Sequence, residues 1–298
     1  MMRFGLLGTG YWARTVHGAA LAAHADVELV GVWGRDPSKA ADLAGALAIH
    51  PYESIDKLLA DVDAVAVALP PDIQAELALR AAEAGRHLLL DKPLALSVEA
   101  ADAVVAEVEA RGLSSVIFFT NRFQPTTVAA LENASSTGGW LGGRATFFGS
   151  IFAPGSPYAD SVWRQQHGGL WDLGPHTLSL LLPVLGPVES VTATAGPRQT
   201  TYATLRHESG AVSTMELTLD SALEAARIET VLHGEHGWLT LPSFDGNTLG
   251  SYERAISELL ASDGSHPLDV HFGREVTAIL AAAEASSTSE RAVKPSRR

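Results

Sequence analysis

The chain of 298 residues is long enough for one large domain or two domains of ordinary size. Hydrophobic residues make up 46% of it and charged residues 18%, which allows packed cores and excludes a disordered chain. The net charge of −13 disfavours binding to nucleic acid or to an anionic membrane surface, and the absence of cysteine excludes disulfides, thiolate metal sites and cysteine nucleophiles.

Apolar runs and alanine-rich helical stretches alternate through residues 1–120. The apolar runs cover residues 3–7, 27–32, 64–69, 86–90 and 115–119, and the helical stretches cover residues 40–47, 73–84 and 98–110. Buried parallel strands have continuous apolar sequences, and helices make the crossovers between them. The alternation therefore predicts an α/β domain with a doubly wound parallel sheet.

The first predicted strand begins at Arg3, with no charged-then-apolar signal pattern before it. No continuous apolar run is long enough to span a membrane. We therefore expect a cytoplasmic protein.

A glycine motif, Gly8-x-Gly10-x-x-Ala13, follows the first predicted strand. Gly8 permits a tight turn, Gly10 lets the backbone approach a pyrophosphate, and Ala13 lets the next helix pack closely on the sheet. The helix that begins near Tyr11 would supply amide donors and a favourable dipole. An isolated motif of this kind can mark only a turn, but its place at the start of an alternating α/β run favours dinucleotide binding.

The end of the second predicted strand bears on the choice between NAD and NADP. NAD-specific sites usually place an acidic residue there, which accepts a hydrogen bond from the ribose 2′-hydroxyl. Gly34 stands at that position and Arg35 follows it, which suits a 2′-phosphate and favours NADP. Asp36 leaves an alternative open, because it could bind the ribose itself or cap the helix that begins near Pro37.

Lys92 follows the fourth apolar run, within the sequence Asp91-Lys92-Pro93. It should emerge at the carboxyl end of the parallel sheet, where ligands of such folds bind. The proline restricts Lys92 to extended geometry and could fix a cis bond. An amine held there could stabilise a developing alkoxide, although a solvated surface lysine is the commoner case at a loop.

Asp172 and His176 have the i, i+4 spacing that places two side chains on one face of a helix. Pro175 is tolerated best in a first helical turn, so the helix should begin close to Asp172, after the Gly168-Gly169 turn. His176 would then lie near a positive helix end, which favours a neutral imidazole that can act as a base. In the alternative interpretation, Asp172 caps the helix and His176 only packs.

The residues from about 121 onward predict a second domain with antiparallel strands. Residues 202–206 and 213–219 alternate between apolar and polar side chains, as half-buried strands do. The segment His233–His236 does not match a metal-ligand spacing, and we expect it to flank a hairpin turn. Residues 271–285 predict a final helix, which could return to the first domain, and the polar residues 286–298 should fray.

Seven segments in this order resemble the Gfo/Idh/MocA family, named for glucose–fructose oxidoreductase, inositol dehydrogenase and rhizopine catabolism. They are residues 4–10, 70–72, 84–87, 91–94, 121–123, 168–176 and 281–287. The resemblance spans essentially the whole chain. It implies a Rossmann domain over residues 1–120 and, over residues 121–298, an α/β domain with a large open, mostly antiparallel sheet that serves as an oligomer interface.

The resemblance also implies an activity and a site. The activity is NAD(P)-dependent transfer of hydride at a carbinol or ketone carbon of a sugar, polyol or similar small molecule. The implied catalytic residues are Lys92, Asp172 and His176. Candidate cofactor-binding residues are Gly8, Gly10, Tyr11, Trp12, Gly34, Arg35, Pro70, Asp91 and Lys92. Candidate substrate residues, from the loop before the Gly-Gly turn and from the domain junction, are Tyr158, Trp163, Arg164, Asn121 and Arg122.

Two positions depart from the family pattern. The family more often has glutamate where this chain has Asp91, and many members have histidine where it has Gln74. We expect a small-molecule substrate, no metal, and a homodimer or homotetramer assembled through the C-terminal sheet. Two other functions stay open. One is an enzyme that oxidises a ring carbon, eliminates a glycosidic substituent and re-reduces the carbon. The other is a nucleotide-responsive regulator without catalysis.

Overall fold

The chain forms two compact units in the computed structural model, which describes residues 1–298. The first unit comprises Met1–Phe123 and Gly246–Arg274, and the second comprises Gln124–Asp245 and Glu275–Arg298. The predicted division after residue 120 assigned all later residues to the second domain, whereas residues 246–274 here complete the first unit. No helix is long and apolar enough to cross a bilayer.

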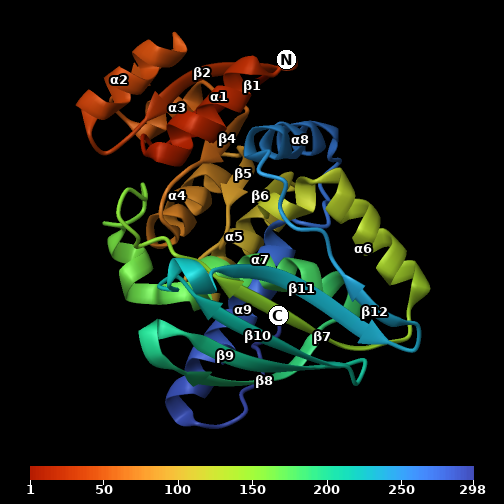
Figure 1. Cartoon of the computed structure of the whole chain (residues 1–298). Coiled ribbons are helices and arrows are strands. Elements are labelled where there is room, and N and C mark those ends of the chain that lie inside the picture. The colour runs from red at the N-terminus through yellow and green to blue at the C-terminus, as the bar shows by residue number, and fades with distance from the viewer. The chain divides into compact units, whose positions relative to one another are not determined.

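The first unit contains a parallel sheet of six strands (Figure 1). In chain order these are β1 (Met2–Leu7), β2 (Val27–Trp33), β3 (His50–Tyr52), β4 (Ala64–Val67), β5 (His87–Asp91) and β6 (Ser115–Phe118). Their order across the sheet is β3-β2-β1-β4-β5-β6, so the direction of winding reverses between β1 and β4. The predicted doubly wound sheet is confirmed, and β3 is a short edge strand that the apolar pattern did not indicate.

Helices connect and cover these strands. They are a π-helical turn (Ala13–His17), α1 (Gly18–Ala23), α2 (Pro37–Leu47), α3 (Ile55–Ala60), α4 (Pro71–Glu83), α5 (Val98–Arg111), a 3-10 turn (Thr120–Phe123) and α8 (Thr248–Ala261). The helical stretches predicted at residues 40–47, 73–84 and 98–110 fall within α2, α4 and α5, apart from residue 84. Side chains at the apolar positions of these helices are buried against the sheet, as the i, i+3, i+4 pattern requires.

Helix α8 explains why the first unit is discontinuous in sequence. Its apolar stripe is fully buried against the first unit, where it packs on α1, β5 and β6; the stripe consists of Tyr252, Ala255, Ile256 and Leu259. Asn247 caps its start by accepting a hydrogen bond from the amide of Gly250 at 3.0 Å. The sequence analysis did not predict this helix.

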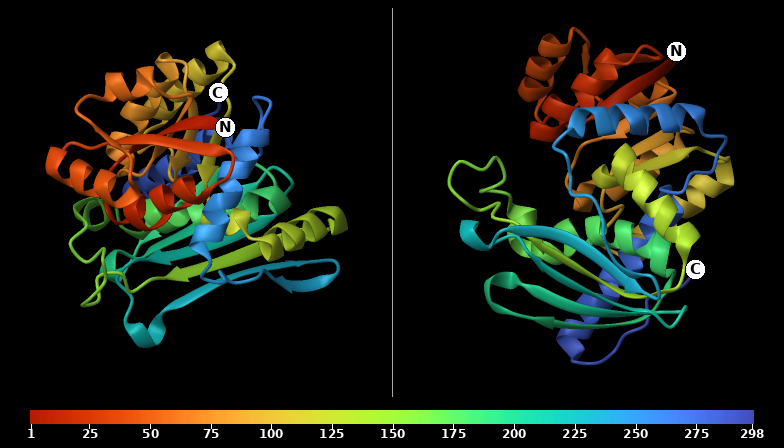
Figure 2. Two further views of the ribbon diagram at one scale, coloured as in Figure 1. Left: turned by 90° about the horizontal axis from the view of Figure 1, so that it is seen from above. Right: turned by 45° about the vertical axis from the view of Figure 1, so that its right-hand side comes forward.

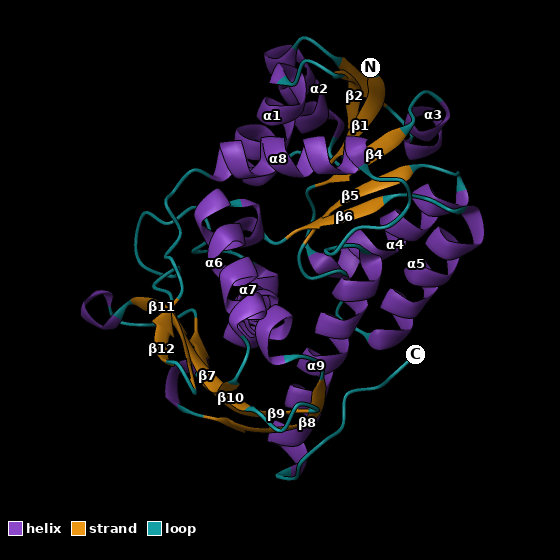
Figure 3. Cartoon of the chain, turned by 90° about the vertical axis from the view of Figure 1, so that its right-hand side faces the viewer, coloured by secondary structure: helices purple, strands orange, loops and turns teal.

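The second unit contains a mostly antiparallel sheet of six strands (Figure 2). The strands are β7 (Trp140–Phe148), β8 (Val188–Ala195), β9 (Thr201–His207), β10 (Val212–Thr218), β11 (Arg227–Gly234) and β12 (Gly237–Thr240), in the order β12-β11-β7-β10-β9-β8. Only β7 and β10 pair in parallel. Helices α6 (Pro125–Thr137), α7 (Val162–Leu185) and α9 (Val270–Ser289) accompany them, with the first residues of α9 in the first unit. Helix α7 packs on one face of the sheet (Figure 3).

The ends of the second unit test two smaller predictions. Strands β11 and β12 form the expected hairpin, in which Gly234 pairs with Gly237 around a two-residue turn. The expected fraying after residue 285 is wrong. Helix α9 continues to Ser289, and Val293 then exchanges two backbone hydrogen bonds with Val191 of β8. Polar composition did not show that this tail has a strand edge to pair with.

Candidate active site

The segment after β1 has the geometry that a pyrophosphate needs. Gly8 has a φ of 122°, and a Cβ there would overlap the carbonyl oxygen of Ala68. A Cβ at Gly10 would meet no atom within 4 Å, so its backbone borders open space. Tyr11, 54% exposed, and Trp12 follow at the start of the helical segment. The residues present therefore fit the phosphates of a dinucleotide.

The end of β2 places Gly34 against the same loop. A Cβ at Gly34 would lie 2.6 Å from the side-chain methyl of Thr9, so an acidic side chain there would displace Thr9. Asp36 is the N-cap of α2, where its Oδ1 accepts from the amide and hydroxyl of Ser38. These hydrogen bonds hold the pKa of Asp36 below its usual value. Arg35, between them, is exposed.

Lys92 follows β5 directly, and its peptide bond to Pro93 is cis. The buried amide of Gln74, on α4, makes three hydrogen bonds to the backbone on either side of it. Its nitrogen donates to the carbonyls of Asp91 at 2.6 Å and of Pro93 at 2.9 Å, and its oxygen accepts from the amide of Asp91 at 2.9 Å. Gln74 therefore fixes the backbone around Lys92. Pro70, another predicted site residue, is the N-cap of α4, and its carbonyl accepts from the amide of Gln74 at 2.9 Å.

Asp91 carries its charge next to Lys92. Its Oδ1 accepts from the amide of Lys92 at 2.8 Å, and its Oδ2 lies 3.7 Å from Nε2 of the buried His17. Burial raises the pKa of Asp91, but His17 and Lys92 lower it more, so the pKa lies below its ordinary value. The carboxylate is thus ionised at neutral pH.

Asp172 and His176 both lie on α7, beyond a kink at Gly168. Gly168 has φ 62° and ψ −161°, which only glycine adopts without strain, and the helix resumes at Gly169. The predicted break at the Gly168-Gly169 turn is confirmed, and the helix resumes at Gly169, three residues before Asp172. Pro175 lies in the second turn after the kink and not in the first, where it was predicted to lie. His176 is about two turns from Gly169, too far for the helix-end argument about its charge.

Asp172 is buried and pairs with Arg164. The guanidinium Nε donates to Oδ2 of Asp172 at 2.8 Å, and the two side chains are 13% and 8% exposed. Arg164 also stacks on two aromatic rings, with its Cζ 4.5 Å from the ring centre of Tyr158 and 4.6 Å from that of Trp163. Three of the predicted substrate residues therefore gather around Asp172. Sequence reasoning did not find the ion pair, because its members lie on opposite sides of the kink.

The other predicted substrate residues, Asn121 and Arg122, belong to the first unit, as Lys92 does. They lie in the 3-10 turn after β6. Burial lowers the pKa of Arg122 to about 10, against the opposing charge of Glu258. His176 lies in the second unit, with its ring 6.1 Å from that of Phe147.

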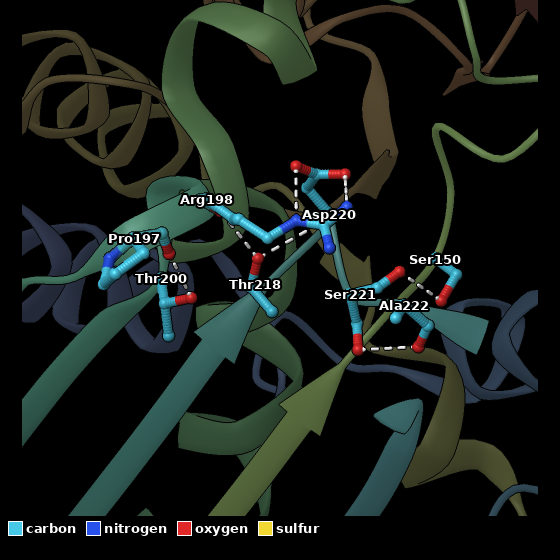
Figure 4. A network of polar contacts seen from close by, with 8 residues as sticks. All are labelled: Ser150, Pro197, Arg198, Thr200, Thr218, Asp220, Ser221 and Ala222. Atoms are coloured by element: carbon cyan, nitrogen blue, oxygen red, sulfur yellow. Dashed lines mark hydrogen bonds and ion pairs between the residues drawn. The ribbon is translucent and has the colours of Figure 1, made fainter. Parts of the chain in front are cut away.

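A polar network in the second unit holds the loop that lies against the kink (Figure 4). Arg198 and Asp220 form a bidentate ion pair with both distances at 3.0 Å, and Thr218 donates to the carbonyl of Arg198 at 2.9 Å. The neighbouring Gln199 donates to the carbonyl of Gln165 at 3.2 Å. The end of β10 thus positions the turn between β8 and β9, and that turn supports the start of the segment that carries Asp172.

Two family models match the chain. The oxidoreductase family with an NAD-binding Rossmann fold matches residues 2–118, and the Gfo/Idh/MocA C-terminal domain matches residues 138–240. The chain is 33% identical over 199 residues to inositol 2-dehydrogenase of Rhizobium meliloti, which covers 65% of the chain and 58% of that enzyme. It is 30% identical over 230 residues to D-xylose 1-dehydrogenase (NADP(+)) 2 of Haloferax volcanii, which covers 74% of the chain and 70% of that enzyme. The first of these matches spans less than two thirds of the relative's length.

The fold is similar to that of solved structures over its whole length. The crystal structure of myo-inositol dehydrogenase from Lactobacillus casei, in complex with NAD(H) and myo-inositol, superposes with a TM-score of 0.85. The identity is 19%, and the match covers 100% of this chain and 98% of that one. One family model spans all six strands of the Rossmann sheet, and the other spans all six strands of the second sheet. The chain therefore belongs to the Gfo/Idh/MocA family of oxidoreductases.

Proposed function

We propose that the protein transfers hydride between a nicotinamide nucleotide and a carbinol or ketone carbon of a sugar, a polyol or a similar small molecule. The observation that most supports this is the strand end at Lys92, which Gln74 fixes by three hydrogen bonds at the carboxyl edge of a Rossmann sheet. Relatives named for inositol and D-xylose suggest the substrate class.

The proposed reaction gives each of three residues one role. His176 accepts the hydroxyl proton of the substrate, and Lys92 donates a hydrogen bond to the same oxygen, which stabilises its developing negative charge. Asp172, with Oδ2 held by Arg164, orients the substrate or the imidazole. The bound nicotinamide supplies the acceptor, or in reduction the donor, of the hydride.

The assay that tests this function uses myo-inositol and D-xylose with NAD and NADP, and follows the reduced nicotinamide. We expect Lys92→Ala to lower kcat by about 100-fold or more, since removing one donor to an oxyanion has that effect. Its affinity for the cofactor should stay near that of the wild type. A Lys92→Ala variant that binds cofactor normally and keeps full activity would overturn the assignment. A separate assay with a glycoside tests the alternative, because elimination of its glycosidic substituent without net reduced nicotinamide would indicate the glycoside-cleaving function.

We also propose that the preferred cofactor is NADP. Thr9 fills the space that an acidic side chain at Gly34 would need, and Asp36 is engaged as a helix cap. Gly34 therefore offers no carboxylate to the ribose 2′-hydroxyl, and Oδ1 of Asp36 already accepts the hydrogen bonds of the cap. Arg35 is exposed beside them, and a guanidinium is suited to a 2′-phosphate.

Calorimetric titration with NADPH and, separately, NADH tests the cofactor preference. The wild type should bind NADPH more tightly, and Arg35→Ala should weaken NADPH by about 10- to 100-fold with little effect on NADH, as loss of a charge-assisted hydrogen bond would. Arg3→Ala is the matched control, because it removes the same charge at the amino end of β1. Equal loss in both variants, or tighter binding of NADH by the wild type, would refute the preference.

For the substrate side, we infer that Tyr158 and Trp163 contact the ligand. They stack on Arg164, whose charge Asp172 already pairs, so Arg164 acts on the substrate only through Asp172. Asn121 and Arg122 stay predictions for the same role. We further infer a homodimer or homotetramer assembled through the second sheet. A row of paired residues on the sheet face opposite α7, Tyr202, Glu216, Thr146 and Glu229, supports this.

A further inference from the structure

His17 is a buried histidine of the first unit, and one of its ring nitrogens has no hydrogen-bond partner. Its side chain has no exposed surface, and its Nδ1 lies 2.8 Å from the hydroxyl oxygen of Tyr252. Its Nε2 makes no hydrogen bond and lies 3.7 Å from Oδ2 of Asp91, beyond hydrogen-bonding distance. Buried polar atoms without a partner are rare in folded proteins. The nearest charged group to this unpartnered nitrogen is therefore the carboxylate of Asp91.

Tyr252 contacts one ring nitrogen of His17 and so bears on which of the two carries the proton. Its ring, on α8, lies 4.2 Å from that of His17 and 4.8 Å from that of Phe118, measured between ring centres. Burial raises the pKa of Tyr252 well above its ordinary value, and the charge of Asp91 adds to this, so the hydroxyl keeps its proton. That proton satisfies the buried site best by donation to Nδ1. A neutral imidazole that accepts at Nδ1 carries its own proton on Nε2, the side that faces Asp91.

The carboxylate of Asp91 extends this chain to Lys92. Its Oδ2 faces His17, and its Oδ1 accepts from the backbone amide of Lys92 at 2.8 Å. Three titratable groups face it: His17 from the π-helical turn, Tyr252 from α8, and Lys92 from its own strand end. The polar chain thus begins at the Tyr252 hydroxyl and ends at the residue that the proposed function makes catalytic.

We propose that Tyr252 and His17 are positioning residues that hold the Asp91 carboxylate and, through it, set the position of Lys92. The proposal rests on the role of Lys92 in the proposed function. His17 ends the helical turn that starts directly after the nucleotide loop. The same chain therefore connects the position of Lys92 to the element that the cofactor phosphates would contact.

Nuclear magnetic resonance tests the chain without a substrate. Protein labelled with ¹⁵N-histidine reports the tautomer of His17 through long-range ¹⁵N–¹H couplings, and His17→Gln assigns its signals. The chain has four lysines, so protein labelled with ¹³C at lysine Cε gives few resonances, and Lys92→Arg assigns that of Lys92. The test variant is Tyr252→Phe. Tyr52→Phe is the matched control, because it removes a hydroxyl that donates to Asp61 at 2.7 Å in the same unit.

We expect His17 in the wild type to carry its proton on Nε2. Tyr252→Phe should remove this preference and shift the Lys92 resonance, whereas Tyr52→Phe should change neither signal. His17→Ala should shift the Lys92 resonance as well, and His17→Gln should restore it toward the wild type, because a glutamine amide can donate to Asp91. The histidine pair decides the question if Tyr252→Phe does not fold.

Two results would overturn the proposal. One is a proton on Nδ1 of His17 in the wild type, and the other is a Lys92 resonance that neither Tyr252→Phe nor His17→Ala moves. Neither signal depends on turnover. Failure here, with Lys92→Ala inactive, would refute the positioning chain alone, whereas a fully active Lys92→Ala would refute the proposed function alone.

Discussion

Single side chains around Asp172 show how a buried charge is kept in place. Arg164 satisfies one carboxylate oxygen by a hydrogen bond of 2.8 Å, and two aromatic rings fix the guanidinium plane. Removing one member of a buried ion pair costs far more than the pair contributes, since the other charge loses its partner in a medium of low dielectric constant. Replacing Arg164 should therefore lower both the free energy of unfolding and the activity.

Arg164→Ala should lower the free energy of unfolding by about 3 kcal/mol, as the loss of a buried partner does. Arg206→Ala provides the control, because Arg206 pairs with Glu189 at 3.4 Å with side chains 65% and 44% exposed. That change should cost less than about 1 kcal/mol. Urea denaturation measures both. Similar losses in the two variants would mean that the Arg164–Asp172 pair contributes no more than a surface pair.

His207 gives the protein a defined loss of stability in mild acid. It is buried between the carbonyl of Gly186 and the hydroxyl of Ser213, and burial lowers its pKa. The unfolded chain takes up a proton below a pH of about 6.5, while the folded protein does so only at lower pH. The contribution of His207 to the free energy of unfolding is therefore fully present above about pH 6.5, and it falls as the pH decreases toward the pKa of His207 in the folded protein.

His207→Gln removes the titration while it keeps a polar side chain at the site. The difference between the urea midpoints at neutral and at mildly acidic pH should be smaller in this variant than in the wild type. The exposed His236→Gln should leave the difference as it is. An unchanged pH dependence in His207→Gln would show that other groups cause the acid loss.

At the scale of elements, the kink in α7 depends on one glycine. Gly168→Ala puts a Cβ on a residue with φ 62° and 3.3 Å from Oε1 of Gln199. We expect a loss of about 1–2 kcal/mol in the free energy of unfolding, together with lower activity, because the strain lies just before Asp172.

Gly45→Ala is the matched control for the kink. Gly45 lies in α2, its φ is not in the left-handed region, and a Cβ there would meet no atom within 4 Å. It should stabilise the protein by about 0.5–1 kcal/mol, through helix propensity. Urea denaturation compares the two, and a neutral Gly168→Ala would show that the kink carries no strain.

Elements with a strong local pattern could be predicted from the sequence, and those that depend on distant partners could not. The residues Ala64–Val67 form a short, continuous apolar run, which is typical of a parallel strand buried on both faces, and this prediction is confirmed. Helix α8 was missed although its buried residues follow the i, i+3, i+4, i+7 pattern and Asn247 caps its start, so the local sequence does indicate a helix. What that pattern does not show is that α8 packs on strands more than a hundred positions earlier in the chain. The break in α7 lies at the Gly168-Gly169 turn, as predicted, whereas Pro175 lies in the second turn beyond it and not in the first.

The candidate site divides in the same way. Strand ends and helix spacing made Lys92, Asp172 and His176 candidates, and the family resemblance implied their catalytic roles, which stay predictions. The contacts around these residues could not be predicted: Arg164 pairs with Asp172, Gln74 binds the backbone of Asp91 and Pro93, and His17 faces Asp91. The sequence analysis named Gln74 and Arg164 for other reasons, and it did not name His17. Contacts between residues that are distant in sequence can be seen only in the folded structure.

Assembly is the question that belongs to the whole molecule. Tyr202 is 45% exposed on β9, within the row that we assign to an interface between copies. Tyr202→Lys would place a charge in that interface, so it should shift light-scattering mass toward the monomer. Lys in place of the exposed Leu223, outside the sheet, should leave the mass unchanged. A monomeric wild type would remove the sheet as an interface.

The discontinuous make-up of the first unit has a consequence for synthesis on the ribosome. Residues 1–123 leave the ribosome early, but Tyr252, which covers His17, is added 129 residues after Phe123 (252 − 123). At elongation rates of about 5–20 residues per second, that interval lasts roughly 6–26 seconds. During it the nascent nucleotide-binding sheet lacks α8, so its apolar flank is open to chaperones. The first unit is therefore complete only after residues 246–274 have left the ribosome.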